Sequence, residues 1–96
     1  MTAYIIARIN VTNMEQYKKY TAVTPEVIGQ FGGRFIVRGG EKVTLEGPEE
    51  TNRMVVIEFP SLERAQAFYQ SDAYQEAKKL REEAATGQFI VVDGVD

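Results

Sequence analysis

The chain has 96 residues, of which 44% are hydrophobic and 26% are charged, and its formal net charge is -3. This is the composition of an ordinary globular protein, and we predict a single domain over residues 1–96. Lysine and arginine gather nowhere along the chain, which argues against a nucleic-acid partner. The apolar runs are too short to span a bilayer, and the first residues lack the pattern of a signal peptide. We therefore expect a cytoplasmic protein with no membrane partner.

The absence of two residue types limits the chemistry open to the protein. The sequence contains no cysteine and no histidine. Without cysteine there is no disulfide, thiolate nucleophile or zinc–thiolate site, and without histidine the commonest general base and metal ligand are missing. Carboxylate pairs spaced for metal binding are not evident either. We expect no metal and no cofactor, so any catalysis would depend on carboxylates, tyrosine, lysine, arginine or backbone amides.

The first third of the chain predicts a strand followed by a long helix. Residues 4–9 form a short segment that is largely apolar and rich in β-branched residues, as in a strand. Thr12 or Asn13 can cap the helix that follows, because either side chain can accept a hydrogen bond from a free amide of the first turn. Pro25 interrupts the helical pattern and lacks an amide hydrogen, so we expect a kink or a restart there. Gly32-Gly33 should end the helix.

The middle of the chain predicts two strands that form a hairpin. Residues 35–38 and 54–59 are apolar on both faces. Gly39-Gly40 indicates a bulge or a sharp bend after the first of these strands, and Val43 and Leu45 then alternate with polar residues. Two alternatives follow for the pairing of the strands. The ladder either continues through Leu45 or breaks at Gly39-Gly40.

The last third predicts helical segments and a final strand. Ser61 can cap a helix, and Ser71 or Asp72 can cap a second one. We expect Gly87 to close this second helix and residues 89–92 to form the fourth strand. The order is then strand, helix, strand, strand, helix, strand. Because right-handed crossovers place both helical layers on one side of an antiparallel sheet, the sequence predicts a ferredoxin-like α+β sandwich with one open sheet face.

The open face of this sheet predicts self-association. A strand exposed on one side normally alternates apolar with polar residues, but the predicted strands contain continuous apolar runs such as Met54 to Ile57. A monomer would expose this patch to water. Burying about 800 Å² of it per partner would make an interface of standard size. We therefore predict a homodimer that packs through the open sheet face.

Several motifs give the chain a family resemblance. They are Arg34-Phe35-Ile36-Val37-Arg38-Gly39-Gly40, Glu46-Gly47, Val55-Val56-Ile57-Glu58-Phe59-Pro60-Ser61, and Phe68-Tyr69-Gln70-Ser71 followed by Tyr74. With these motifs nearly the whole chain resembles a small bacterial family of unknown function in the dimeric α+β barrel superfamily, beside antibiotic-biosynthesis monooxygenases and muconolactone isomerases. The resemblance implies a ferredoxin-like protomer and a homodimeric barrel. It implies no reaction, and the better-studied cousins often use a histidine that this chain lacks.

Glu58 is the first candidate site residue, because it follows four apolar strand residues. A carboxylate in that setting has to be paired, protonated or close to water. Its candidate partners are Arg8 on a neighbouring strand expected to run parallel, Arg38 if the hairpin ladder is continuous, and Arg34 if the ladder breaks. In one interpretation Arg38 binds an anionic group in a pocket and Glu58 acts as a base. In the other, which we favour, an ion pair only fixes the strand register.

Tyr69, Tyr74 and Arg81 form a second candidate site. Tyr74 and Arg81 are two helical turns apart and so share a face, and Tyr69 lies just before the helix break. Together they could bind a small ligand with a carboxylate or an aromatic ring between the helices and the sheet. The alternative, which we favour slightly, is aromatic core packing with the arginine stem lying across apolar surface.

Three functions fit these observations. The first is a small-molecule-binding homodimer with a pocket between sheet and helices, whose ligand is small and anionic or aromatic. The second is a cofactor-independent isomerase or oxygenase acting on a small organic acid or aromatic compound, with Glu58 as its catalytic residue; it depends on superfamily analogy, and fold alone is a weak guide to function. The third is a structural or accessory dimer without a ligand.

Overall fold

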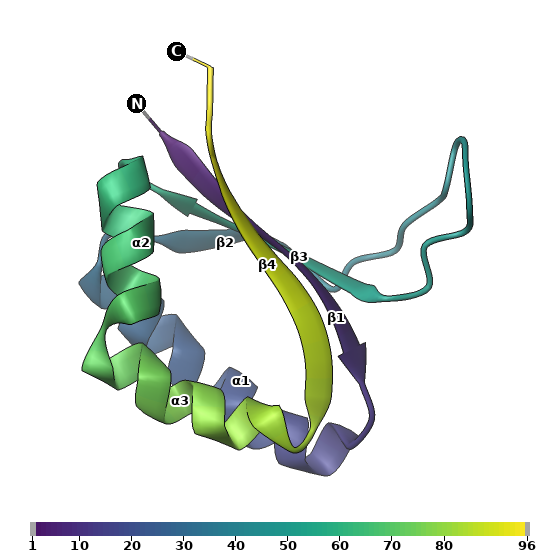
Figure 1. The fold of residues 1–96 in the computed structure, drawn as a ribbon, viewed down its shortest axis with the longest axis horizontal. Coiled ribbons are helices and arrows are strands. Elements are labelled where there is room, and N and C mark those ends of the chain that lie inside the picture. The colour runs from purple at the N-terminus through teal and green to yellow at the C-terminus, as the bar shows by residue number, and fades with distance from the viewer. Residues whose placement is uncertain (1, 96) are drawn as a thin grey trace.

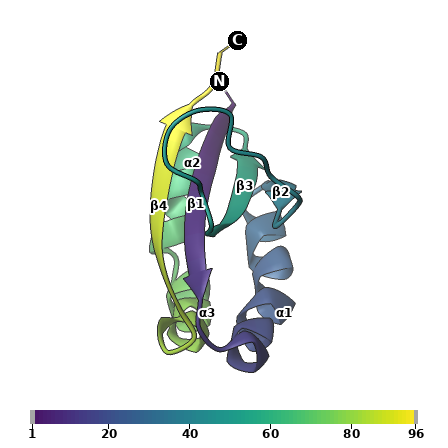
Figure 2. The same ribbon diagram turned by 90° about the vertical axis from the view of Figure 1, so that its right-hand side faces the viewer.

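The computed structural model describes residues 2–95, which form three helices and four strands (Figure 1). In chain order the elements are β1 (Ala3–Val11), α1 (Met14–Gln30), β2 (Arg34–Arg38), β3 (Arg53–Phe59), α2 (Leu62–Gln70), α3 (Asp72–Glu82) and β4 (Ala85–Asp93). The strands form one antiparallel sheet in the order β2-β3-β1-β4. All helices cover the same face of the sheet and leave the other face open (Figures 1 and 2). The predicted ferredoxin-like βαββαβ arrangement is confirmed.

Alternation along the two central strands separates the faces of the sheet. The side chains buried beneath the helices are Ala3, Ile5, Ala7, Ile9, Val55, Ile57 and Phe59. The residues between them, on the open side, are Tyr4, Ile6, Arg8, Met54, Val56 and Glu58. The open side therefore carries apolar residues as well, which agrees with the prediction of strands that are apolar on both faces.

β1 and β3 run antiparallel, with Tyr4 opposite Glu58 and Arg8 opposite Met54. The prediction that β1 runs parallel to the strand of Glu58 was therefore wrong. β2 follows a crossover and has the direction of β1, so β3, which returns from β2, must run against both. Met54, the residue opposite Arg8, is four residues from Glu58, which is about 13 Å along the strand. Arg8 forms an ion pair with Glu50 instead.

α1 continues through Pro25 as one helix. Because proline has no amide hydrogen, the carbonyl of Thr21, four residues earlier, lacks its usual helical partner. Arg38 on β2 donates a hydrogen bond from Nη2 to this carbonyl at 3.0 Å. Of the expected kink or restart at Pro25, the restart does not occur, since a side chain from the sheet replaces the missing bond. No helix within residues 2–95 has both the length and the apolar character needed to cross a bilayer.

Ser71 lies at the break between α2 and α3 and caps α3, and it is one of the two residues predicted for this role. Its hydroxyl donates to the carbonyl of Phe68 at 2.7 Å, at the end of α2. It also accepts from the amide of Tyr74 at 3.1 Å, in the first turn of α3. One side chain thus satisfies a backbone group at the end of one helix and another at the start of the next.

The end of α3 differs from the prediction. The helix stops at Glu82 and β4 already begins at Ala85, so Gly87 lies inside the strand, opposite Ile9. A Cβ atom on Gly87 would lie 2.9 Å from the carbonyl oxygen of Arg8. The glycine therefore serves close contact between β4 and β1 instead of ending a helix.

The β2–β3 hairpin decides between the two pairing alternatives. Arg34 pairs with Glu58 and Arg38 with Val55, and the register shifts between Phe35 and Val37 in a β-bulge. Beyond Arg38 the ladder stops, and residues 39–52, which we call the arm, contain neither strand nor helix. The break at Gly39-Gly40 is confirmed, and a ladder extending through Leu45 was wrong. The arm leaves the sheet on its open side (Figures 1 and 2).

Candidate functional site

A cleft of about 450 Å³ opens between α2, α3 and β4. This volume lies within the range of about 300–1,000 Å³ that is typical of small-molecule sites. The lining residues are Ala65, Gln66, Tyr69 and Gln70 of α2, Lys78 and Arg81 of α3, and Ile5, Gly87, Phe89, Ile90 and Val91 of the sheet. The charged residues of this lining are both cations, and the rest are apolar, aromatic or neutral. The cleft is therefore suited to an anion with an apolar body.

Arg81 is the charged residue most deeply placed in this cleft, with only 6% of its surface exposed. Its guanidinium carbon lies 4.6 Å from the ring centre of Phe89 and 5.7 Å from that of Tyr20. Its Nε is buried without a hydrogen-bond partner, and no ion pair within residues 2–95 includes it. A buried guanidinium without a counter-charge is unfavourable, and the π faces of two rings compensate only part of this cost. Arg81 thus leaves donor capacity and positive charge free for a ligand.

Aromatic rings form the wall beside Arg81. The ring centre of Tyr69 lies 5.0 Å from that of Tyr74 and 6.1 Å from that of Phe89. The Nζ atom of Lys78 lies 5.6 Å from the Tyr69 ring. A flat apolar group entering the cleft would meet these rings, while an attached anion would meet the two cations.

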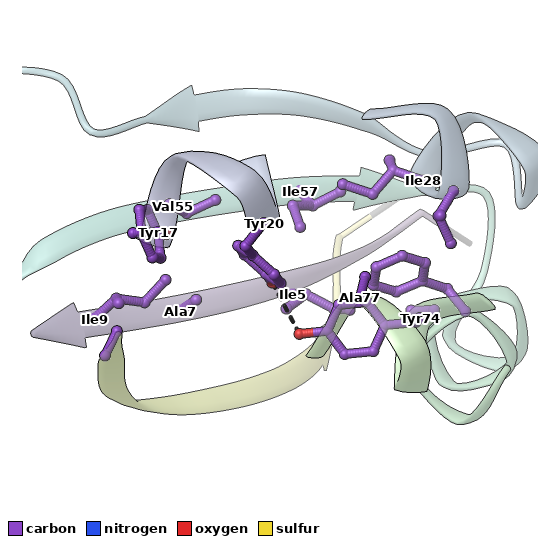
Figure 3. Packing of buried hydrophobic residues seen from close by; sticks show 14 of the residues in the cluster. Ile5, Ala7, Ile9, Tyr17, Tyr20, Ile28, Val55, Ile57, Tyr74 and Ala77 are labelled. Atoms are coloured by element: carbon purple, nitrogen blue, oxygen red, sulfur yellow. Dashed lines mark hydrogen bonds between the residues drawn. The ribbon is translucent and has the colours of Figure 1, made fainter. Parts of the chain in front are cut away.

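Behind this wall, the hydroxyls of Tyr20 on α1 and Tyr74 on α3 form a buried hydrogen bond of 2.9 Å (Figure 3). Burial raises the pKa of both tyrosines above the ordinary value, and the Tyr74 hydroxyl raises the pKa of Tyr20 further. The positive charge of Arg81 acts in the opposite direction on both. Both phenols therefore stay neutral at neutral pH. Tyr74, 1% exposed, acts as core and as support for the cleft wall.

A second cavity of only about 20 Å³ lies between α1 and the sheet and has space for about one water molecule. Arg53 is among its lining residues, with its guanidinium carbon 5.9 Å from the ring centre of Tyr17 and its Nε buried without a partner. Burial raises the pKa of Tyr17, and the charge of Arg53 opposes this shift. The cavity is too small for an organic ligand, so it is not the candidate site.

The structure separates the predicted pair Arg38 and Glu58. Arg38 is opposite Val55, on the helix side, whereas Glu58 lies on the open side and pairs with Arg34 (Nε to Oε1, 3.3 Å). Without the bulge, Arg34 and Arg38 would share a face, since they are four residues apart in a strand. The bulge at Ile36 reverses this and sends them to opposite sides. A pocket formed by Arg38 and Glu58 together was therefore wrong.

The second predicted group is brought together. Tyr69 and Arg81 line the same cleft, and Tyr74 stands directly behind it. The sequence reasoning missed Lys78 and Phe89. Lys78 follows Tyr74 by four residues and precedes Arg81 by three, so helical spacing could have placed it on the same face. Phe89 had no such signal, because its place depends on the pairing of β4 with β1.

The fold and the cleft describe a ferredoxin-like α+β protein with one helix-covered sheet face. Residues 2–95 match the family model described as Domain of unknown function (DUF1330), and the chain belongs to this family. This agrees with the resemblance that the sequence motifs suggested. No curated protein matches the chain.

Solved structures share the fold at low sequence identity. A protein of unknown function from Rhodopseudomonas palustris has a TM-score of 0.77 at 21% identity, with 99% of this chain and 83% of that chain covered. A dimeric ferredoxin-like protein of unknown function from Jannaschia sp. has a TM-score of 0.72 at 10% identity, covering 98% and 100%. SnoaB, a cofactor-independent oxygenase from Streptomyces nogalater, has a TM-score of 0.67 at 10% identity, covering 99% and 94%.

Proposed function

We propose that this protein is a homodimer that binds a small anionic organic molecule, with an aromatic or apolar body, in the cleft between α2, α3 and β4. The observation that carries the proposal is the buried guanidinium of Arg81, which lines the cleft and has no carboxylate partner within residues 2–95. A ligand carboxylate would supply this partner and would form short, charge-assisted hydrogen bonds. Lys78 would add a second positive charge, and Tyr69 and Phe89 would contact the ligand body.

The homodimer is supported by the open face of the sheet. Large apolar side chains on or beside this face are partly exposed, among them Ile36, Val37, Ile90 and Val92. The two charged pairs of this side, Arg8–Glu50 and Arg34–Glu58, neutralise their own charges. A neutral, apolar surface of this kind fits against a second copy better than against water. The dimeric protein from Jannaschia sp. has the same fold, which supports this arrangement by analogy.

Isothermal titration calorimetry with benzoate and its neutral analogue benzamide tests the ligand class. We expect benzoate to bind and benzamide to bind at least ~10-fold more weakly, because a hydrogen-bonded charge contributes about 1.5–3 kcal/mol. Arg81→Met should weaken benzoate binding by a similar factor and leave benzamide unchanged. Arg64→Met is the matched control, since Arg64 also lies over an aromatic ring, that of Phe31, but does not line the cleft. Equal binding of benzoate by the wild-type protein and Arg81→Met would contradict the proposal.

Catalysis is the weaker alternative. Glu58, the predicted base, is paired with Arg34 on the sheet face opposite the cleft, and the residues that line the cleft include no carboxylate. No observation therefore brings a general base to the ligand. If the cleft only binds, Glu58→Gln should leave the benzoate affinity unchanged within twofold in the same titration.

A further inference from the structure

Within residues 2–95, no segment covers the apolar side chains of the arm, residues 39–52. Leu45 is 94% exposed and Val43 is 76% exposed. A loop of this length without secondary structure is uncommon in a small domain and is usually functional or disordered. This one is not loosely attached, because the Gly39 amide donates to the Met54 carbonyl at 2.8 Å at one end and Glu50 pairs with Arg8 at the other.

Further contacts hold the arm in shape near its second end. The amide of Glu50 donates to the hydroxyl of Thr44 at 2.9 Å, and the amide of Asn52 donates to the carboxylate of Glu50 at 3.0 Å. Glu50 thus connects the arm both to itself and, through Arg8, to the open face of the sheet. Leu45 and Val43 are therefore held outward by an ordered frame.

The direction of the arm places it where a second copy would pack. In Figure 1 it points away from the helices, and in Figure 2, seen from the open side, it passes in front of β1 and β4. Any molecule that packs on the open face meets the arm. With two-fold symmetry the contact occurs twice, because the arm of each protomer reaches its partner in the same way.

The size of the open face also favours a contribution from the arm. Four strands spaced about 4.8 Å apart, with 5 to 9 residues each at about 3.3 Å per residue, present a flat footprint of roughly 480 Å². This flat area is smaller than the ~800 Å² of accessible surface that each partner buries in a standard interface. The exposed apolar part of the arm is the surface adjoining this face that can supply the difference.

We propose that the arm is a clasp that packs Leu45 and Val43 against the second copy of the chain in the homodimer. This inference rests on the proposed homodimer but not on the proposed ligand. The arm contributes apolar contact area at the margin of the interface, and the sheet faces contribute its centre. The charged residues of the arm are four glutamates and Lys42, so two copies of the arm carry the same negative charge, and we expect Leu45 and Val43 to make the contact.

Because the natural chain has no cysteine, a spin label on Leu45→Cys reports the arm alone. We expect an immobilised spectrum in the dimer that becomes mobile when Val56→Asp on the open face is added. A label on Glu76→Cys, an exposed position on α3, should give the same spectrum in both backgrounds.

In unlabelled protein, Leu45→Asp should raise the dimer dissociation constant at least ~10-fold, since two leucines lose their contact. Thr51→Asp, which adds the same charge at the root of the arm, should change it less than threefold.

Light scattering on the same samples separates the two ideas. A dimer with a mobile Leu45 label and an unchanged dissociation constant for Leu45→Asp would overturn the clasp and leave the homodimer intact. A monomeric wild-type protein would overturn both.

Discussion

Arg38, Arg53 and Arg81 are on the helix side of the sheet, and no ion pair within residues 2–95 includes any of them. Arg38 donates a hydrogen bond to the Thr21 carbonyl, and Arg53 packs against Gly39 and the ring of Tyr17. Both arginines therefore have structural roles. Arg81 is the member of this group that opens onto a cleft large enough for a ligand, which is why the functional proposal depends on it.

The bond from Arg38 to Thr21 can be tested with Pro25. Arg38→Met should lower the free energy of unfolding by about 1 kcal/mol, because the Thr21 carbonyl loses its donor. In a Pro25→Ala background the new amide of residue 25 can bond to this carbonyl, so the same substitution should cost about half as much or less. Urea denaturation of the four proteins gives the coupling energy. Strictly additive effects would contradict this account of the helix.

The buried tyrosines predict a loss of stability at alkaline pH. The pKa values of Tyr17, Tyr20 and Tyr74 are raised in the folded protein, so the folded state holds these protons more tightly than the unfolded chain. Their stabilising contribution is complete below the ordinary tyrosine pKa of 10.0 and is lost as the pH rises above it. Urea denaturation between pH 7 and 11 should show this decline. In Tyr20→Phe the decline should be shallower, by up to about 1.4 kcal/mol per pH unit, and an identical slope would argue against the burial effect.

Among the elements, the junction of α2 and α3 depends on one side chain. Ser71→Ala should destabilise the protein by about 2 kcal/mol, because a half-buried hydroxyl serves both helices. Ser61→Ala is the matched control, since the Ser61 hydroxyl caps only α2, through the Arg64 amide, and should cost about 1 kcal/mol. Equal losses in the unfolding free energy of the two variants would refute a double role for Ser71.

Periodicity and caps were enough to predict the order of the elements and the sheet with one open face. They failed where the outcome depends on contacts between distant segments. The bulge at Ile36 separates Arg38 from Glu58, and no local signal marks it, because Ile36 is an ordinary strand residue. Gly87 looked like a helix stop, although its role is close packing of β4 on β1. At the site, helical spacing was enough to predict that Tyr74 and Arg81 share a face. The position of Phe89 beside them depends on the pairing of β4 with β1 and could not be predicted in this way.

As a whole, the molecule is thin, with principal extents of 31 × 31 × 16 Å. One layer of helices covers one face of the sheet, and the apolar open face is not covered by a second layer within residues 2–95. Sheet-to-sheet packing of two copies would give a four-layered dimer in which both apolar sheet faces are buried.

The dimer prediction is tested on the open face itself. Val56→Asp places a charge in the middle of this face, beside Ile6 and Val37. We expect the variant to be monomeric by light scattering at micromolar concentration and to keep its circular dichroism spectrum. Ala73→Asp, which adds the same charge on the exposed side of α3, should remain dimeric. A dimeric Val56→Asp protein would place the interface elsewhere.

The most direct test of the binding site is a crystal structure of the protein with 4-bromobenzoate, located by the anomalous signal of its bromine. We expect a bromine peak in the cleft between α2 and β4, with the carboxylate bound to Arg81 and the ring against Tyr69 and Phe89. A bromine peak only on the open sheet face, or an empty cleft at a ligand concentration that saturates the protein in solution, would contradict it.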